Sequence, residues 1–396
     1  HAPAPSVLPP RRWVTALLCL VTITWVFAYT PTPMVLAVVP GLIGWLAVME
    51  RSRSFKEVMG WLVVFGAVAT SIGYHWLAQT VQDFGNIPVI PSYLLTALFG
   101  VMGIVHGMIF VIVHRLMLAR GRRPHPMVTV LLIVAVEALP IRLFPWKMGH
   151  GAVDVPPLVQ AAAWGGVSGV SFVLLSLVIP INEWFVWAFG RRGPAARPRA
   201  ALATFAVGCL FYGFGHFQYR AALAEEREAT ETLRIAIVQP DVGRKDKREA
   251  TNGGGNARAQ SLAAYERGSR KAAAAAAELI VWPETAVVDS VPVMEPQPDA
   301  HVTNGYLNRV GYRFLGELGQ KHAFLIGMYE RKQVKARLSG TKLDERYNTA
   351  ALRMPGGRDA PWVVYRKVFL IPFGEYLPVP LDEEKYLPQK FKMRPG

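Results

Sequence analysis

The pattern of hydrophobic and polar positions changes near the middle of the chain. Apolar runs long enough to cross a bilayer as helices recur through the first half and stop near Phe217. The pattern predicts seven membrane spans, at residues 13–29, 33–49, 58–77, 93–118, 126–143, 157–189 and 200–217. The sixth run contains Pro180, which predicts a kink or a separate interfacial piece.

The second half alternates strand and helix patterns. Two helices are predicted, at residues 256–277 and, as one amphipathic helix, at residues 307–318. Strands are predicted in LRIAIVQP from Leu233, ELIVWPE from Glu278, AFLIGMYE from Ala323, YNTAALRM from Tyr347 and WVVYRKVFLI from Trp362. A Pro-Gly-Gly turn at residues 355–357 joins the last two strands as a hairpin. We therefore expect a helical transmembrane bundle over residues 1–220 and a layered α/β domain over residues 221–396.

Composition and charge support a membrane protein with a defined orientation. Hydrophobic residues make up 52% of the chain and charged residues only 18%, unlike a soluble enzyme. Thirteen basic residues fall on one side of the predicted spans, and only Arg142 and Lys147 fall in the short loops on the other. The thirteen are Arg11, Arg12, Arg51, Arg53, Lys56, Arg115, Arg120, Arg122, Arg123, Arg191, Arg192, Arg197 and Arg199.

Basic residues accumulate in cytoplasmic loops, so this asymmetry places the amino terminus in the cytoplasm and everything after Phe217 outside. The net charge of +15 is then largely a topology signal and requires no nucleic acid partner.

Cysteine and histidine usage argues against a metal site or a disulfide framework. The two cysteines, Cys19 and Cys209, both lie inside predicted spans, where a structural role is favoured. The histidines are scattered, without metal-ligand spacing, and no phosphate-binding glycine loop is present. We expect neither a metal nor a cofactor.

The stretch LIVWPETA, residues 279–286, holds a candidate catalytic group. Its first four residues read as a buried strand that ends directly before Glu284. Glu284 is either the first solvated residue of a turn or a general base that Trp282 desolvates on one side. This stretch alone leaves both interpretations open.

Three motifs in order, LIVWPET, YNTAALRM and YRKVFLIPFGEYLP, resemble the carbon–nitrogen hydrolase (nitrilase) superfamily. The segment from Lys367 to Tyr376 is similar to the apolipoprotein N-acyltransferase family within it. The membrane half also resembles that family, in LFPWKMGH at residues 143–150 and GGVSGVSF at residues 165–172. The resemblance implies an αββα sandwich on the extracytoplasmic face of a bacterial inner membrane, behind a multi-pass bundle.

The resemblance also implies site residues. The family's catalytic Glu falls on Glu284, its Lys on Lys367 and its second acidic residue on Glu375, while Asn348 and Tyr376 fall in the substrate-binding region. From the residues alone, Lys367 could be a solvated strand lysine, Glu375 a cap or surface charge, and Asn348 the start of a turn.

The implied reaction is a ping-pong acyl transfer. A Cys thiolate attacks an acyl ester of a membrane phospholipid, and the α-amine of a diacylglyceryl-cysteine on an apolipoprotein then attacks the thioester. Two departures stand out: the segment PDVGRKDKREA has Arg248 where the family often has Trp, and no cysteine follows Lys367. We expect the nucleophilic cysteine beyond Gly396, on the next strand of an unfinished sandwich, and residues 1–396 to be inactive alone.

Two other function classes stay open. A membrane-anchored amidase or nitrilase would share every catalytic residue. The other class is non-enzymatic, either a transporter-like bundle or a scaffold whose external domain binds partners. A transport bundle would be expected to carry paired intramembrane charges or broken helices in matched halves. Glu137 is an acidic residue deep in a predicted span, but no inverted repeat is visible.

Overall fold

The computed structural model describes most of the chain in segments. These are residues 35–52, 54–85, 87–103, 105–120, 124–139, 146–189, 198–241, 255–292, 300–335, 342–357, 360–371, 375 and 393–395. The first predicted span, at residues 13–29, lies outside them. The chain divides into two compact units, His1–Ala229 and Thr230–Gly396. The predicted domain boundary at residue 220 falls inside helix α10 (Pro198–Glu228), which continues through a charged segment to Glu228.

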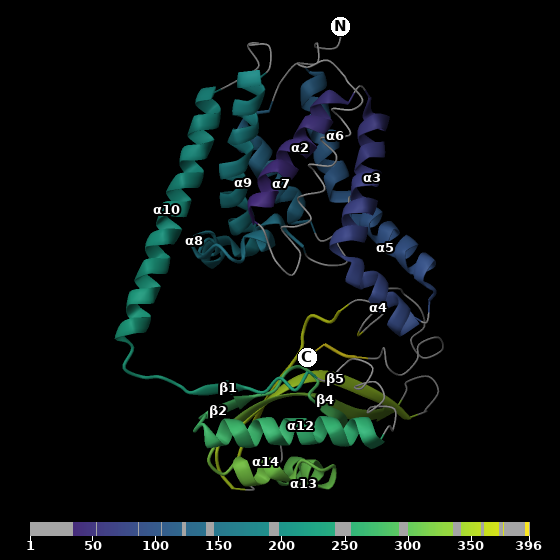
Figure 1. The fold of residues 1–396 in the computed structure, drawn as a ribbon, viewed down its shortest axis with the longest axis vertical. Helices are drawn as coiled ribbons and strands as arrows, with labels where there is room; N and C mark the ends of the chain where they lie inside the picture. The colour runs from purple at the N-terminus through teal and green to yellow at the C-terminus, as the bar shows by residue number, and fades with distance from the viewer. Residues whose placement is uncertain are drawn as a thin grey trace. The chain divides into compact units, whose positions relative to one another are not determined.

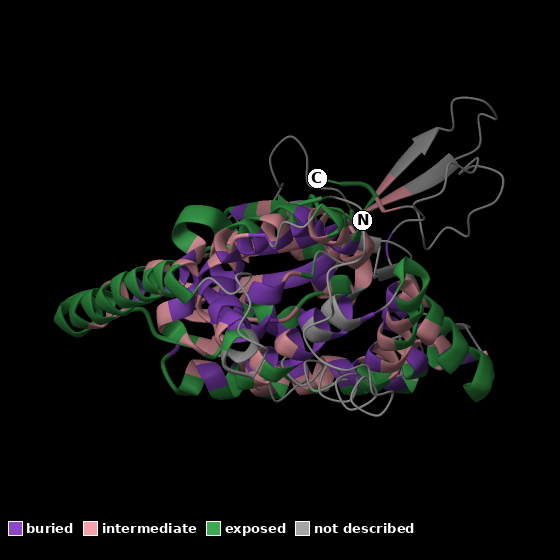
Figure 2. Ribbon diagram, turned by 90° about the horizontal axis from the view of Figure 1, so that it is seen from above, coloured by how far each residue is buried: buried purple, intermediate pink, exposed green. Residues whose placement is uncertain are grey.

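In the part of the first unit that the structure describes, the chain is helical, and three helices are long and apolar enough to cross a membrane. These are α3, the part of α9 at Ala162–Trp184, and α10, whose C-terminal half is mostly exposed (Figure 2). The remaining apolar helices are shorter. The helices are α2 (Val38–Arg51), α3 (Phe55–Gly73), α4 (His75–Gly85), α5 (Val89–Gly103), α6 (Val105–Ala119), α7 (Pro126–Glu137), α8 (Pro156–Val159), α9 (Ala162–Phe189) and α10, with short 3₁₀ helices η2 (Val35–Ala37) and η3 (Met148–Ala152).

Three predicted features of this unit differ in the structure. The fourth predicted span, residues 93–118, is two helices: α5 packs mainly on α3 and α4, and α6 mainly on α7 (Figure 1). Helix α4 follows α3 where no helix was predicted. Inside α9 the non-helical residues are Gly165 and Gly166 rather than Pro180, because Gly166 has a φ of 56° that favours glycine.

The two membrane motifs of the sequence lie against each other. The Gly149 N–H donates to the Ser171 hydroxyl at 2.8 Å, and the Lys147 ammonium donates to the Ser168 hydroxyl at 2.6 Å. Buried Glu137, at the end of α7, accepts a hydrogen bond from the Met148 N–H at 2.8 Å. The carboxylate that sequence analysis found inside a span therefore holds the loop at residues 146–152, and this contact gives no support to a transport role.

The second unit contains a mixed six-stranded sheet in the order β1-β2-β4-β5-β6, with β3 also paired to β4 (Figure 1). Pairing is parallel from β1 through β4 and antiparallel from β4 to β6. The five predicted strands and the final hairpin are confirmed, and β3 is an unpredicted addition. The strands are β1 (Ile235–Ile237), β2 (Leu279–Val281), β3 (Val287–Pro292), β4 (Ala323–Lys335), β5 (Lys342–Arg353) and β6 (Trp362–Arg366).

Helices α12 (Gly255–Ala274), α13 (Ala300–Arg309) and α14 (Arg313–Leu318) cover one face of this sheet (Figure 1). The single helix predicted at residues 307–318 is wrong, because Gly311, with a φ of 104°, separates α13 from α14. Trp282, Phe314 and Phe324 pack in the core between helices and sheet. Side chains of alternate strand residues on the other face are exposed, including Ile237 at 75% and Tyr365 at 64%.

Buried Arg353, the last residue of β5, fixes the far end of the hairpin. Its guanidinium donates to the carbonyl of Gly319, at the end of α14, and to the carbonyls of Gly356 and Gly357, at 3.1 Å each. Burial lowers the pKa of Arg353. The arginine thus joins the hairpin turn to the helix layer through backbone carbonyls.

Candidate active site

Glu284 lies on a short excursion that interrupts one side of the sheet. The Trp282 N–H donates to the Leu325 carbonyl and the Ala286 N–H to the Gly327 carbonyl, each at 2.8 Å. Only residues 283–285 leave the sheet, before the chain resumes as β3 against the same strand β4. The predicted end of a strand before Glu284 is confirmed, since β2 ends at Val281, and the unpredicted strand β3 begins at Val287.

Two backbone features support the excursion. Thr285 has a φ of 55°, in the left-handed region that non-glycine residues seldom adopt. Gly327 lies directly beneath, where an added Cβ would stand 2.6 Å from the Glu284 Cα atom and 2.3 Å from the Pro283 carbonyl oxygen. A glycine at position 327 is therefore required for Glu284 to approach the sheet this closely.

The expectation that Trp282 desolvates Glu284 is wrong. The Trp282 ring is buried in the core with Tyr265 and Phe324, and its Nε1–H donates to the Ser269 hydroxyl at 3.0 Å. The Glu284 side chain is 60% exposed, so its surroundings are set by polar partners and not by the tryptophan.

Asn348 and Lys367 occupy one rung of the sheet next to this excursion. Asn348 lies within β5 and is buried, so it does not start a turn. Lys367 comes one residue after the end of β6, and its N–H donates to the Asn348 carbonyl at 2.8 Å. The predicted fifth strand therefore ends earlier than expected, but its last rung holds the lysine beside the asparagine.

Glu375 approaches the same place from the loop after β6. Its carboxylate accepts a hydrogen bond from the Ile371 N–H at 2.7 Å, and its own N–H donates to the Ile371 carbonyl at 2.9 Å. Its side chain is 10% exposed, which excludes the interpretation as a surface charge. The interpretation of Glu375 as a cap is confirmed by these two hydrogen bonds with Ile371. They also orient the carboxylate toward Lys367.

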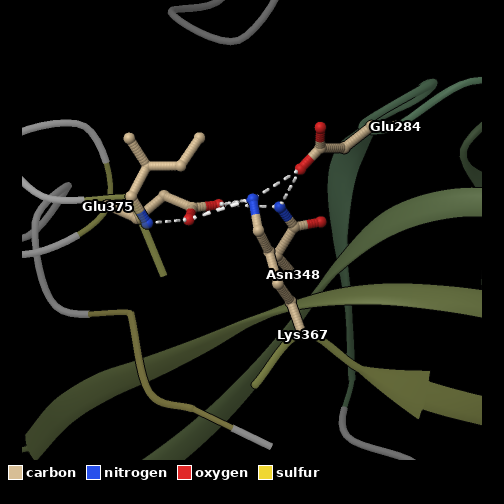
Figure 3. Close-up of polar contacts among 5 residues, drawn as sticks. Glu284, Asn348, Lys367 and Glu375 are labelled. Atoms are coloured by element: carbon tan, nitrogen blue, oxygen red, sulfur yellow. Dashed lines mark hydrogen bonds and ion pairs between the residues drawn. The ribbon is translucent and has the colours of Figure 1, made fainter. Parts of the chain in front are cut away.

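The four residues converge on one another (Figure 3). The Lys367 ammonium lies 3.2 Å from the Glu284 Oε1 and 3.1 Å from the Glu375 Oε2. The Asn348 amide donates to the same Glu284 oxygen, and to the Glu375 Oε1 at 2.8 Å. One lysine and one amide thus hold two carboxylates that would otherwise repel each other.

The lysine is held in its charged form. Burial on its own would lower the pKa of Lys367, but hydrogen bonds to Glu375 and Glu284 outweigh it and raise that pKa above the ordinary value. A fixed ammonium next to a carboxylate can stabilise a developing oxyanion while the carboxylate accepts a proton. The arrangement therefore fits acid–base and nucleophilic chemistry at a carbonyl carbon.

Tyr329 is a neighbour that sequence analysis missed. It pairs with Asn348 across β4 and β5, on the same face of the sheet. Burial, followed by the charges of Glu375 and Glu284, raises the pKa of Tyr329, so its phenol stays neutral at physiological pH. No motif marks this tyrosine, because its place follows from a strand register that a single sequence does not specify.

Other expected site features are not placed by the structure. Tyr376 and Arg248 lie outside the described residues, as does Cys19. Cys209 lies on α10 in the first unit and carries a free, exposed thiol, whereas the four converging residues all belong to the second unit. Within the described segments, no group of three or more His, Cys, Asp or Glu side chains has an arrangement suited to a metal ion.

Comparisons with known proteins point to one family. The family described as "Apolipoprotein N-acyltransferase N-terminal domain" matches residues 21–179. An apolipoprotein N-acyltransferase of Bdellovibrio bacteriovorus is 28% identical over 89% of this chain. The chain is thus similar to apolipoprotein N-acyltransferases. Similar relatives carry the same name in Haemophilus ducreyi, at 23% identity over 89% of this chain, and the name "Apolipoprotein N-acyltransferase 2" in Leptospira interrogans, at 24% over 84%.

The alignments cover most of this chain but a smaller share of each relative. The chain spans 60% of the length of the Bdellovibrio apolipoprotein N-acyltransferase, 61% of the Haemophilus protein and 56% of the Leptospira protein. The family match at residues 21–179 falls within the first unit, and the Bdellovibrio alignment, 382 residues long, reaches into the second. The similarity to apolipoprotein N-acyltransferases therefore extends over both units.

Proposed function

We propose that this protein transfers an acyl chain from a membrane phospholipid to the amino-terminal diacylglyceryl-cysteine of apolipoproteins. The observation that carries the proposal is the convergence of Glu284, Lys367, Asn348 and Glu375 on one side of the sheet. The names of the relatives support the same reaction class. We further propose that the second unit has the nitrilase-like fold.

Each residue has a separate role in the proposed reaction. Glu284 takes the proton of a cysteine thiol, and Lys367 stabilises the oxyanion that forms when the thiolate attacks the phospholipid ester. Asn348 orients Glu284, and Glu375 holds the lysine from its other side. Lysophospholipid leaves, and the acceptor amine attacks the thioester.

The proposed reaction also requires a cysteine thiol as the nucleophile. A nucleophile must lie within hydrogen-bond reach of its base, and a thiolate inside an apolar membrane helix is poorly solvated. Cys209 lies in such a helix, in the other unit from Glu284. We therefore propose that a cysteine other than Cys19 and Cys209 is the nucleophile.

We also propose that the protein resides in the bacterial inner membrane with its second unit on the extracytoplasmic face. The C-terminal ends of α2, α6 and α9 lie at one end of the first unit, next to the N-terminal ends of α3, α7 and α10 (Figure 1). Arg115 contributes there by donating to the Met49 and Ser52 carbonyls at 3.1 and 2.9 Å. This basic end is the cytoplasmic one in our proposal, because positive residues remain inside.

Labelling with an impermeant thiol reagent tests the orientation. In intact cells whose outer membrane has been permeabilised, single cysteines replacing Asp241 or Lys335 are expected to react, and one replacing Arg122 is expected to react only after lysis. The reverse pattern would show that the second unit is cytoplasmic.

Acyl transfer in vesicles tests the activity and separates it from the amidase alternative. The full-length protein is incubated with a phospholipid carrying a labelled acyl chain and a diacylglyceryl-cysteine peptide, with an N-acetylated peptide as the matched control. We expect label on the free-amine peptide alone. Label recovered only as free fatty acid with both peptides would instead identify a hydrolase.

A further inference from the structure

A buried ion pair lies directly behind the candidate site, on the opposite face of the sheet. The Arg366 guanidinium contacts both oxygens of Glu330, through Nε at 2.7 Å and Nη2 at 3.3 Å. Glu330 also accepts a hydrogen bond from the Thr349 hydroxyl at 2.8 Å. The Glu330 side chain is fully buried and that of Arg366 is 17% exposed, so the pair is shielded from water.

Every member of this cluster is the chain neighbour of a residue on the site's face. Glu330 follows Tyr329 on β4, Thr349 follows Asn348 on β5, and Arg366 directly precedes Lys367. Successive side chains of a strand point to opposite faces, so the two groups lie back to back across the sheet. The pair therefore connects β4 and β6, the two strands on either side of β5, beneath the rung that carries Asn348 and Lys367.

The ion pair between Glu330 and Arg366 lies at the end of strand β6. β6 pairs with β5 only from Trp362 to Arg366, and Lys367 makes one more backbone hydrogen bond before the chain leaves the sheet. The two contacts with Glu330 fix the orientation of the Arg366 guanidinium, whose central carbon lies 4.7 Å from the centre of the Tyr347 ring. A short strand end would fray without such a restraint.

Stability alone does not explain a buried ion pair, because removing two charges from water costs about as much as their attraction returns. A bidentate guanidinium–carboxylate contact does, however, fix relative positions in a way that apolar packing does not. We propose that Glu330 and Arg366 are positioning residues, which set the height of Lys367 and Asn348 relative to Glu284 without touching substrate. This inference rests on the proposed acyl transfer.

The test separates position from stability in the full-length protein. The double variant Glu330→Met/Arg366→Met removes both charges together, so its melting temperature is expected to stay near or above that of the wild type. Misplacement of catalytic groups by an ångström lowers rates by about a hundredfold, so kcat for acyl-enzyme formation is expected to fall about 10- to 100-fold. The KM for phospholipid is expected to change by less than about twofold, since the pair lies on the face away from the substrate.

Arg353→Met is the matched control. This variant removes another buried arginine from the same hairpin, at the end of β5 away from the site, and exchanges its carbonyl contacts for an apolar side chain. Its melting temperature is expected to fall while kcat stays within about twofold of the wild type.

Three outcomes distinguish the possibilities. A folded double variant with wild-type kcat would overturn the positioning role. Absence of an acyl-enzyme in the wild type would overturn the proposed function instead. If the double variant does not fold, Thr349→Val decides, because it removes only the hydroxyl that Glu330 accepts: a fall in kcat of about fivefold at unchanged KM supports the inference, and an unchanged kcat contradicts it.

Discussion

Lys367→Met is expected to slow acyl-enzyme formation by about 100- to 1,000-fold, the loss seen when one donor to a developing oxyanion is removed. The effect should be large because the ammonium also separates two carboxylates, at 3.2 Å from Glu284 and 3.1 Å from Glu375. Without it, the charges of Glu284 and Glu375 repel each other as well as the oxyanion. Single-turnover transfer of a labelled acyl chain to the full-length protein measures the rate.

Two further variants sharpen this prediction. Lys321→Met removes an exposed lysine from the turn before β4 and is expected to leave the rate unchanged. Lys367→Arg keeps the charge but is expected to restore little activity, because a planar guanidinium cannot reproduce the contacts of a compact ammonium. If Lys367→Met had the rate of the wild type, Lys367 would have no catalytic role, and its interpretation as a solvated lysine would hold.

Glu284→Gln is expected to slow the same step by about a hundredfold or more. The amide is nearly the same size and can still accept hydrogen bonds from Asn348 and Lys367, so the fold should persist. The amide cannot take the proton of a thiol, which is the function we assign to Glu284. The melting temperature and the single-turnover rate are measured on the same preparation.

Glu278→Gln is the matched control for this variant. Glu278 is exposed just before β2 and accepts a hydrogen bond from the Arg234 N–H at 3.1 Å, on the same segment as Glu284 but away from the site. Its rate is expected to equal that of the wild type. Near-normal thioester formation in Glu284→Gln would leave Glu284 as an ordinary turn residue.

Much of the second unit could be predicted because its signals are local. Short β-branched and apolar runs marked β1, β2, β4, β5 and β6, and the Pro-Gly-Gly turn marked the hairpin. β3 was missed because its sequence, VVDSVP, contains Asp, Ser and Pro, residues that strands disfavour. Pairing with β4 outweighs that local preference.

Helix breaks were harder to predict, since apolar periodicity continues across them. The run at residues 93–118 reads as one span, yet α5 and α6 pack against different partners. Gly311 likewise divides an amphipathic pattern into α13 and α14 by adopting a positive φ. In both places tertiary packing decides the boundary.

The residues of the candidate site could be predicted from sequence, but their surroundings could not. Motif resemblance marked Glu284, Asn348, Lys367 and Glu375, and the structure brings all four together (Figure 3). The surroundings of Glu284 could not be predicted, because the direction of Trp282 depends on which face of the sheet the helices cover. Residues such as Tyr329 and Glu330 can be placed near the site only once the register of β4 against β5 is known.

The most direct measurement is the mass of the full-length protein after brief exposure to a phospholipid of defined acyl chain. The account predicts an increase equal to one acyl chain, removed by hydroxylamine, mapped by peptide analysis to a cysteine other than Cys19 and Cys209, and absent from Glu284→Gln at the same time point. An unchanged mass in the wild type, or an acyl chain carried by Cys209, would contradict it.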